Sequence, residues 1–474
     1  MLDLLIRGGT VIDGSGAVRR RADVAVQGER IVALGDLAGE RAHRVLDAQG
    51  LVVAPGFIDS HTHDDRLLLE PVPRHPKLLQ GVTTVVTGNC GASLAPLHRP
   101  PEGFDLMGAA DFGFAHFADY LQALRAAPPA TNAVPLVGHT TLRMACMSAL
   151  DRPATAAECE AMAAEVAHAF EAGAFGLSTG VYYPPARAAS TDELIAVGRP
   201  LAGRGLVTMH IRDEGDAIDT ALREALAVGR ALDVDLVLSH HKLMGRANHG
   251  RSRETLALLE QAAAGQRVCI DCYPYAASST VLLPERVALS TDVQITWSRA
   301  EPSAAGRSLR QMAAERGLAP EALARQLLPA GAIYFAMDEA DVERILAHPL
   351  TMIGSDGIPQ DAVPHPRLWG SFPRVLGHYA RDRGLLSLEA AVHKMTGLTA
   401  RRFGLAARGL VAPGHFADLV LFDPATVADR ARFDDPVQPP QGIGTVLLNG
   451  RVVVDEGAVT ELRAGRLLQR HVPE

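Results

Sequence analysis

The chain has 474 residues, 47% of them hydrophobic, so it is long enough to bury the core of a large domain together with an accessory one. Its net charge of −8 argues against nucleic acid and anionic membranes as partners. Five cysteines, an odd number scattered along the chain, fit reduced thiols, and residues 1–7 lack the basic and long apolar stretches of a signal peptide or membrane anchor, so we expect a cytoplasmic protein.

Short strand patterns occupy both ends of the chain. Residues 22–32 alternate apolar and polar side chains around a turn, which is typical of a hairpin. Residues 417–422 and 445–454 show the same pattern, the second with a turn at Asn449-Gly450. We therefore expect residues 1–54 and 405–474 to pair into one small β-sandwich domain.

Strand-like and helix-like segments alternate through the middle of the chain. The segment 190–193 (STDE), for example, predicts a capping box that opens an amphipathic helix extending to about Gly203. This alternation favours a parallel sheet of the α/β class, and the length favours a closed (β/α)8 barrel over residues 55–404. Residues from about 285 to 345 do not follow this alternation of strand-like and helix-like segments.

Two histidines, His61 and His63, close the apolar run of residues 52–58. Side chains at positions i and i+2 of a strand point to the same side, so both imidazoles leave the strand end together and can share one metal ion. Two histidines at this spacing also occur as solvated loop residues, so the interpretation depends on the rest of the chain.

Three further residues of ligand type lie downstream. His210, His240 and Asp356 each stand where an apolar, strand-like run stops. In a barrel of parallel strands, the residues at the C-terminal strand ends converge on one mouth. Any one of them could be a hydrogen-bonded histidine or a capping aspartate, but five such residues at equivalent places predict a metal site.

Longer motifs surround these residues and resemble a known family. The segment 56–65 (GFIDSHTHDD) is similar to the first-strand signature of the amidohydrolase superfamily. Further segments are similar to those of the N-acyl-D-amino acid deacylases, or D-aminoacylases: 87–91 (TGNCG), 176–180 (GLSTG), 239–242 (SHHK), 271–275 (DCYPY), 354–357 (GSDG) and 365–370 (HPRLWG). The resemblance runs nearly end to end. It implies a metal-dependent barrel and a small inserted domain at residues 285–345 that covers the barrel mouth.

The metal set that the resemblance implies centres on Cys90. Many superfamily members bridge two metals with a carboxylated lysine on the fourth barrel strand, but this sequence has no lysine between Lys77 and Lys242. The D-aminoacylases use a cysteine thiolate instead, and Cys90 matches it. The resemblance therefore implies one tightly bound zinc ion on Cys90, His210 and His240. A possible weaker second site is lined by His61, His63, Cys90 and Asp356. A buried, inert thiol is the alternative for Cys90.

Lysine usage gives an independent indication. Only Lys77, Lys242 and Lys394 among the 46 basic residues are lysine. Because an ammonium and a guanidinium are not interchangeable in a tight site, we expect Lys242, two residues past His240, to contact substrate at the barrel mouth. The alternative is that Lys242 is an ordinary surface lysine with no role in the site.

The resemblance also implies how the substrate's carboxylate is held. In the family an arginine, a lysine, a tyrosine and a serine bind it, and the matching residues are Arg367, Lys242, Tyr183 and Ser279. The planar guanidinium of Arg367 can bind a carboxylate through two parallel hydrogen bonds. Tyr182 is the nearest alternative to Tyr183. Arg212 either supports the site or belongs to a salt bridge at the barrel rim.

The predicted function is zinc-dependent hydrolysis of the amide bond of N-acyl-D-amino acids, which are small-molecule substrates. Asp356 is the candidate general base and acid, because a carboxylate beside the metal can accept the proton of the attacking water. The preference for D substrates rests on the resemblance alone. An N-acyl-D-glutamate or D-aspartate deacylase stays open. A cyclic amide hydrolase of the hydantoinase type is disfavoured by the missing lysine, and a non-catalytic scaffold by the complete ligand set.

Overall fold

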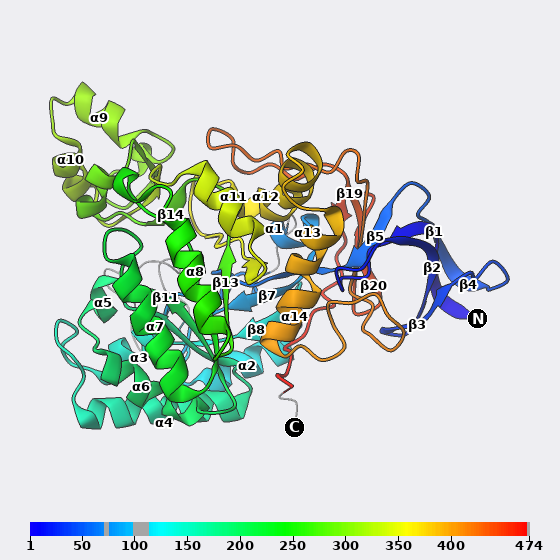
Figure 1. Cartoon of the computed structure of the whole chain (residues 1–474), viewed down its shortest axis with the longest axis horizontal. Coiled ribbons are helices and arrows are strands. Elements are labelled where there is room, and N and C mark those ends of the chain that lie inside the picture. The colour runs from blue at the N-terminus through cyan, green and yellow to red at the C-terminus, as the bar shows by residue number, and fades with distance from the viewer. Residues whose placement is uncertain (71–74, 98–112, 472–474) are drawn as a thin grey trace.

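A sheet built from both ends of the chain lies at one end of the molecule (Figure 1). The structure, a computed structural model, describes residues 1–70, 75–97 and 113–471. The sheet has nine strands in the order β21-β20-β19-β18-β5-β1-β2-β3, with β4 paired to β1. Its strands are β1 (Leu2–Val11), β2 (Arg20–Gln27), β3 (Arg30–Gly35), β4 (Ala42–Asp47), β5 (Val52–Pro55), β18 (Leu419–Phe422), β19 (Ile443–Leu448), β20 (Arg451–Asp455) and β21 (Ala458–Val459). The expected pairing of the two termini is confirmed, because β18 is antiparallel to β5.

Local sequence explains these strands. The β19–β20 hairpin turns at Asn449 and Gly450, whose φ angles are 49° and 78°. Positive φ at both central residues is the turn conformation that Asn-Gly favours, because it matches the twist of the flanking strands. Alternate apolar side chains of β1, β2, β18 and β19 form one buried cluster, which includes Ile6, Val24 and Leu419.

Parallel strands form the centre of the molecule, which confirms the predicted α/β alternation. They pair in the orders β6-β7-β8 and β17-β13-β12-β11-β10-β9. The strands are β6 (Phe57–Asp59), β7 (Val82–Thr87), β8 (Asn132–Pro135), β9 (Val137–Gly138), β10 (Gly176–Gly180), β11 (Leu206–His210), β12 (Asp235–Leu238), β13 (Val268–Cys272) and β17 (Thr351–Ile353). Every pairing among them is parallel, so their C-terminal ends lie on one side.

Helices connect the parallel strands and cover them (Figure 1). They are α1 (Pro76–Leu79), α2 (Phe117–Ala126), α3 (His139–Cys146), α4 (Ala156–Ala172), α5 (Pro184–Arg187), α6 (Thr191–Gly198), η1 (Arg199–Leu201), α7 (Ile218–Leu232), η2 (Arg246–Asn248), α8 (Ser252–Ala263), α11 (Glu339–Ala347), α12 (Arg367–Arg374), η5 (Val375–Asp382), α13 (Leu388–Met395) and α14 (Gly397–Phe403). In the described ranges, no helix has the length and apolar character needed to cross a membrane.

The start of α6 differs from its prediction. Ser190 caps the helix by accepting from the Glu193 amide at 3.1 Å, but the Glu193 side chain does not return to Ser190 to complete a capping box. It binds Arg143, His139 and the Ala154 amide instead. Burial explains the difference, since a carboxylate removed from water is stabilised more by a buried guanidinium than by a helix-end amide.

A three-stranded antiparallel sheet interrupts the alternation between β13 and β17. It consists of β14 (Ser278–Val281), β16 (Ala330–Tyr334) and β15 (Val293–Ser298), in that order. The segments η3 (Pro284–Leu289), η4 (Pro302–Ala304), α9 (Leu309–Glu315) and α10 (Pro320–Leu327) accompany it. These elements bury their own apolar cluster, and α9 and α10 lie far from the terminal sheet (Figure 1).

Candidate metal centre and substrate site

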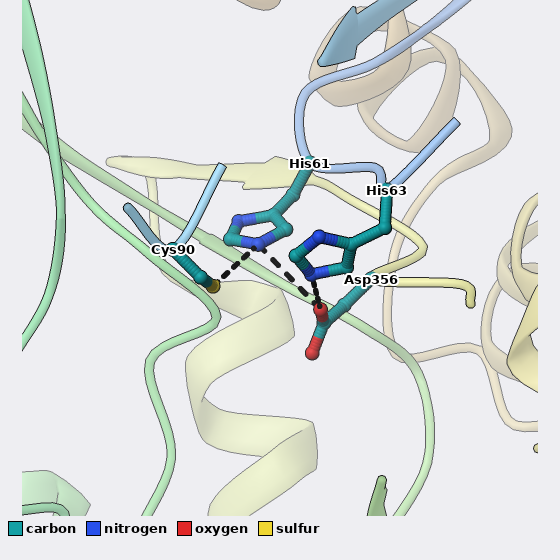
Figure 2. A group of neighbouring side chains, drawn as sticks. All are labelled: His61, His63, Cys90 and Asp356. Carbon is teal, nitrogen blue, oxygen red and sulfur yellow. Dashed lines mark hydrogen bonds and ion pairs between the residues drawn. The ribbon is translucent and has the colours of Figure 1, made fainter. Parts of the chain in front are cut away.

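His61 and His63 follow β6 and approach the loop after β17. The Nε2 atom of His63 lies 3.2 Å from Oδ1 of Asp356, and Nε2 of His61 lies 3.5 Å from the same oxygen. His61 Nε2 also lies 3.2 Å from Sγ of Cys90, which follows β7. Figure 2 shows the four side chains converging from three loops. The structure therefore brings together the residues predicted for the weaker metal site.

Cys90 also belongs to a second group, with His210 at the end of β11 and His240 after β12. Its Sγ atom lies 3.4 Å from Nε2 of His240, and that nitrogen lies 2.9 Å from Nδ1 of His210. Within each group the possible ligand atoms lie within 4.8 Å of one another. The thiol is thus shared by two clusters, each with three or more potential metal ligands.

The backbone is strained at three of these residues. Cys90, His240 and Asp356 have φ angles of 55°, 36° and 50°, in the left-handed region that non-glycine residues seldom adopt. Such conformations persist only where the surroundings enforce them, and they cluster at functional sites. The backbone at Cys90 is also closely packed, because a Cβ atom at Gly180 would lie 2.0 Å from the Cys90 carbonyl oxygen.

Burial sets the protonation of the donors. It lowers the pKa of His61 to about 3 and lowers those of His210 and His240 as well, so these imidazoles are neutral at pH 7 and keep a lone pair. Burial, aided by the negative charge of Asp356, holds the pKa of the Cys90 thiol well above its ordinary value of 9.0. A metal that binds here must therefore displace a proton from Cys90.

Asp356 is ionised in spite of its burial. Burial works to raise its pKa, but Arg367, with Nη1 2.9 Å from Oδ2 of Asp356, and the neighbouring histidines outweigh it and hold the pKa well below the ordinary 3.8. A carboxylate in this state accepts protons and metal ions.

Two buried groups support the metal-facing residues. Asp271 in β13 accepts a bond from the His240 amide at 2.8 Å and lies 3.4 Å from Nδ1 of His61. Lys77 donates to Asp59 at 2.9 Å and to Ser355 at 2.6 Å, which joins the strand ends that carry His61 and Asp356. Sequence reasoning assigned no role to Asp271, Asp59 or Ser355.

The residues predicted to hold a carboxylate lie around Asp356 and the histidines. Nη2 of Arg367 donates to the Ser279 carbonyl at 2.8 Å, and its guanidinium lies 4.5 Å from the Tyr273 ring centroid. The Ser279 hydroxyl is buried and has no hydrogen-bond partner among the described residues. The Tyr183 hydroxyl lies 3.0 Å from Oγ1 of Thr280, and its ring packs edge-on against His210.

Lys242 is buried rather than on the surface. Its Nζ binds the Glu214 carboxylate, donates to the His240 carbonyl at 3.0 Å and lies 2.7 Å from Nδ1 of His240. Burial alone would raise the pKa of Glu214, but Lys242 and His210 outweigh it and hold that pKa well below its ordinary value. Glu214 was not predicted from the sequence; its position four residues after His210 was the available signal.

A cavity of about 380 Å³ adjoins this region, lined by Tyr182, Glu214, Arg286, Leu289 and neighbouring residues. Arg286, from η3 of the inserted segment, binds Glu214 at 3.1 Å and lies 4.1 Å above the Tyr182 ring. Tyr182 itself stacks on His210, so both tyrosines of the pair line the site.

Arg212 lines the same cavity, but its hydrogen bonds and its salt bridge go to residues other than the candidate metal ligands. Its guanidinium forms a salt bridge with Glu224, with a shortest distance of 2.8 Å, and donates to the carbonyls of Arg187 and Ala189. It belongs to the rim salt bridge that sequence analysis gave as one of its two alternatives.

Comparison with known proteins agrees with this geometry. The amidohydrolase family model matches residues 44–294 and 291–454. The chain is 57% identical to D-aminoacylase of Alcaligenes xylosoxydans xylosoxydans, over 99% of this chain and 98% of that protein. It is 55% identical to N-acyl-D-aspartate deacylase of the same organism, over 98% and 95%.

Two solved structures superpose closely. A structure from work on the binuclear metal centre of D-aminoacylase has a TM-score of 0.97 and 56% identity, covering 99% of this chain and all of that one. N-acyl-D-glutamate deacylase from Bordetella bronchiseptica, with zinc and a phosphonate that mimics the tetrahedral intermediate, has a TM-score of 0.94 and 48% identity, covering 99% of each chain.

Proposed function

The chain belongs to the amidohydrolase family, and we propose that it hydrolyses the amide bond of N-acyl-D-amino acids to a carboxylate and a free D-amino acid. The observation that carries this proposal is the pair of clusters that share Cys90, with two buried cations, Arg367 and Lys242, beside them. Clusters of this kind suit metal-assisted hydrolysis, and the cations suit a substrate with a free carboxylate. The names of the two curated relatives agree with this substrate class.

We propose zinc as the metal, held tightly by Cys90, His210 and His240, with a weaker second position at His61, His63, Cys90 and Asp356. The donor chemistry fits, because neutral imidazoles and a thiolate are preferred zinc ligands. When bound, zinc lowers the pKa of a water and polarises the scissile carbonyl. The zinc named for the N-acyl-D-glutamate deacylase structure supports the choice of metal, and the binuclear metal centre named for D-aminoacylase supports the two positions.

Asp356 accepts the proton of the attacking water and returns it to the leaving nitrogen. Its low pKa ensures that it is ionised at neutral pH, and the bond to Arg367 restrains its basicity. A substrate carboxylate that draws Arg367 away from Asp356 would raise that pKa, so substrate binding would make Asp356 a stronger base.

The substrate's α-carboxylate binds Arg367 and Lys242, with Tyr183 and Ser279 completing its contacts. The unpaired hydroxyl of Ser279 and the unpaired Nε of Arg367 support this placement, because both are buried donors without a partner among the described residues. Buried donors without a partner are costly, and a bound carboxylate would satisfy them.

A second candidate is deacylation of N-acyl-D-aspartate or N-acyl-D-glutamate. Arg286 favours it, since its guanidinium lines the 380 Å³ cavity beside the proposed carboxylate anchors. A side-chain carboxylate in that cavity would be a second anionic partner for Arg286, which already pairs with Glu214, whereas an apolar side chain would make no charge-assisted bond there.

We also propose that the parallel strands close as a (β/α)8 barrel over residues 55–404. The Ser60 amide donates to the Ile353 carbonyl at 3.3 Å, which supports contact between the first and last strands. We retain residues 1–54 and 405–474 as a β-sandwich domain and 285–345 as a lid-like insertion, supported by their separate buried clusters. A cytoplasmic location remains a prediction from cysteine usage.

The proposed function is tested with a panel of N-acetyl-D- and N-acetyl-L-amino acids that carry apolar, acidic and basic side chains, together with analysis of bound metal. We expect turnover of the D series only, with zinc present. Preference for acidic side chains would select the second candidate. Turnover of hydantoins or neutral amides in place of the free acids would refute both.

A further inference from the structure

One carboxylate lies behind both histidines of the Cys90 group. His240 Nε2 and His210 Nδ1 face each other and Cys90, whereas the remaining ring nitrogens point the other way. Oε1 of Glu214 lies 3.2 Å from Nδ1 of His240 and 3.5 Å from Nε2 of His210. The same oxygen binds Lys242. Three polar groups therefore converge on a single acceptor.

Both histidines need a hydrogen-bond acceptor at the ring nitrogen that faces away from the metal, and Glu214 can supply it. A neutral imidazole that offers one nitrogen to a metal carries its proton on the other, so His240 Nδ1 and His210 Nε2 are both donors in the loaded site. Lysine has three donors and no acceptor, so Lys242, 2.7 Å from His240 Nδ1, cannot accept that proton. His210 Nε2 is buried and has no hydrogen-bond partner among the described residues. In the part of the chain that the structure describes, Glu214 is the acceptor that lies near both nitrogens, 3.2 Å from His240 Nδ1 and 3.5 Å from His210 Nε2.

Glu214 is itself held from two other directions. Its Oε2 accepts from Arg286 at 3.1 Å, and its backbone carbonyl accepts from the Met244 amide at 2.7 Å. The carboxylate thus joins the loop after β11, the loop after β12 and the inserted segment. Its side chain is almost completely buried.

We propose that Glu214 is a positioning residue that fixes the tautomer and orientation of both metal-binding histidines while it holds Lys242 beside them. The inference rests on the zinc assigned under the proposed function and names a residue that acts on that zinc only through its ligands. Glu214 links the proposed zinc ligands to Lys242, a proposed contact of the substrate's carboxylate, because its Oε1 atom contacts both His240 and Lys242.

The test compares Glu214→Gln with Glu224→Gln. Glu224 is a matched control, since it is also a mostly buried partner of an arginine, Arg212, but contacts none of the proposed metal ligands. Each zinc-loaded variant is titrated with a chelator, and the zinc dissociation constant is derived from zinc release. Urea unfolding of the zinc-free proteins measures stability separately.

Glu214→Gln should bind zinc about 10- to 100-fold more weakly than wild type, the usual cost of losing a carboxylate partner of a ligating histidine. Glu224→Gln should stay within about twofold of wild type, because it touches no ligand. Should Glu214→Gln fail to fold, Glu214→Asp is used; it keeps the charge but withdraws the oxygen, so we expect weaker zinc binding there too.

Zinc affinity equal to wild type, or an equal loss in Glu214→Gln and Glu224→Gln, would overturn the proposal. A loss of zinc-free stability with unchanged zinc affinity would also overturn it, because Glu214 would then serve the fold alone. The assay uses no substrate, so failure of the proposed deacylase activity would be seen separately, in the substrate panel.

Discussion

Arg367 offers the sharpest test of how substrate is recognised. It is fully buried, its Nη1 lies 2.9 Å from Asp356, and its Nη2 donates to the Ser279 carbonyl. Arg367→Met keeps most of the side-chain volume and removes the charge. If the guanidinium holds the substrate's carboxylate, the lost charge-assisted bond is worth about 1.5–3 kcal/mol, so kcat/KM for N-acetyl-D-leucine should fall about ten- to a hundredfold.

A matched control lies on the same helix. Arg374 also pairs with a carboxylate, that of Asp429 at 3.3 Å, and also lies over a tyrosine ring, that of Tyr275. It contacts none of the proposed ligands or anchors, so Arg374→Met should change kcat/KM by less than about threefold, as expected for a residue that acts only on the fold.

The assay is the initial rate of hydrolysis of N-acetyl-D-leucine and of its C-terminal amide, with pH varied. Arg367→Met should affect the acid strongly and the amide little. Because Arg367 helps to hold the pKa of Asp356 low, its loss should raise that pKa, and the acidic limb of the kcat/KM profile should shift to higher pH. Equal losses on acid and amide would show that Arg367 supports the fold or the metal instead.

Four other predictions follow from the same geometry. Cys90→Ala should lose the tightly bound zinc and nearly all turnover with retained circular dichroism, and a variant with full zinc and wild-type rate would refute its role as a ligand. Asp356→Asn should keep the tight zinc but lower kcat by at least about a hundredfold, whereas a change of a few fold would assign the base elsewhere. Lys77→Met should lower the free energy of unfolding in urea by about 3–5 kcal/mol, because it leaves the buried Asp59 carboxylate uncompensated; an unchanged midpoint would contradict this. Zinc affinity should rise about tenfold per pH unit between about pH 6 and 8, since the thiol, whose pKa is raised, releases one proton on binding and the neutral histidines release none; a flat profile would be inconsistent with Cys90 as a ligand.

The ligand-type residues could be placed from the sequence because each follows an apolar run. His61, His63, Cys90, His210, His240 and Asp356 all stand at strand ends, and the structure brings these six side chains together. A parallel arrangement of strands makes position along a strand equivalent to position in space. This one pattern predicted His61, His63, His210, His240 and Asp356, whereas Cys90 was predicted as a ligand from the family resemblance.

The surrounding residues could not be located in this way. Glu214 and Arg286 lie 72 positions apart and meet because the inserted segment folds back over the loop after β11. No periodicity encodes that contact. The capping box expected at Ser190 fails for the same reason, since Glu193 turns to Arg143 and His139, which are distant in sequence. A local sequence pattern does not show which residues, distant in sequence, will bind a side chain in place of its local partner once the chain has folded.

The zinc-loaded protein should hydrolyse the amide bond of an N-acyl-D-amino acid. We would measure the leucine released from N-acetyl-D-leucine and from N-acetyl-L-leucine, with and without zinc. We predict zinc-dependent release from the D substrate at a kcat/KM within the range of about 10⁴–10⁸ M⁻¹s⁻¹ typical of enzymes, and no measurable release from the L substrate. Equal rates on both enantiomers, or release that is independent of zinc, would show that the protein is not a zinc-dependent deacylase of D substrates.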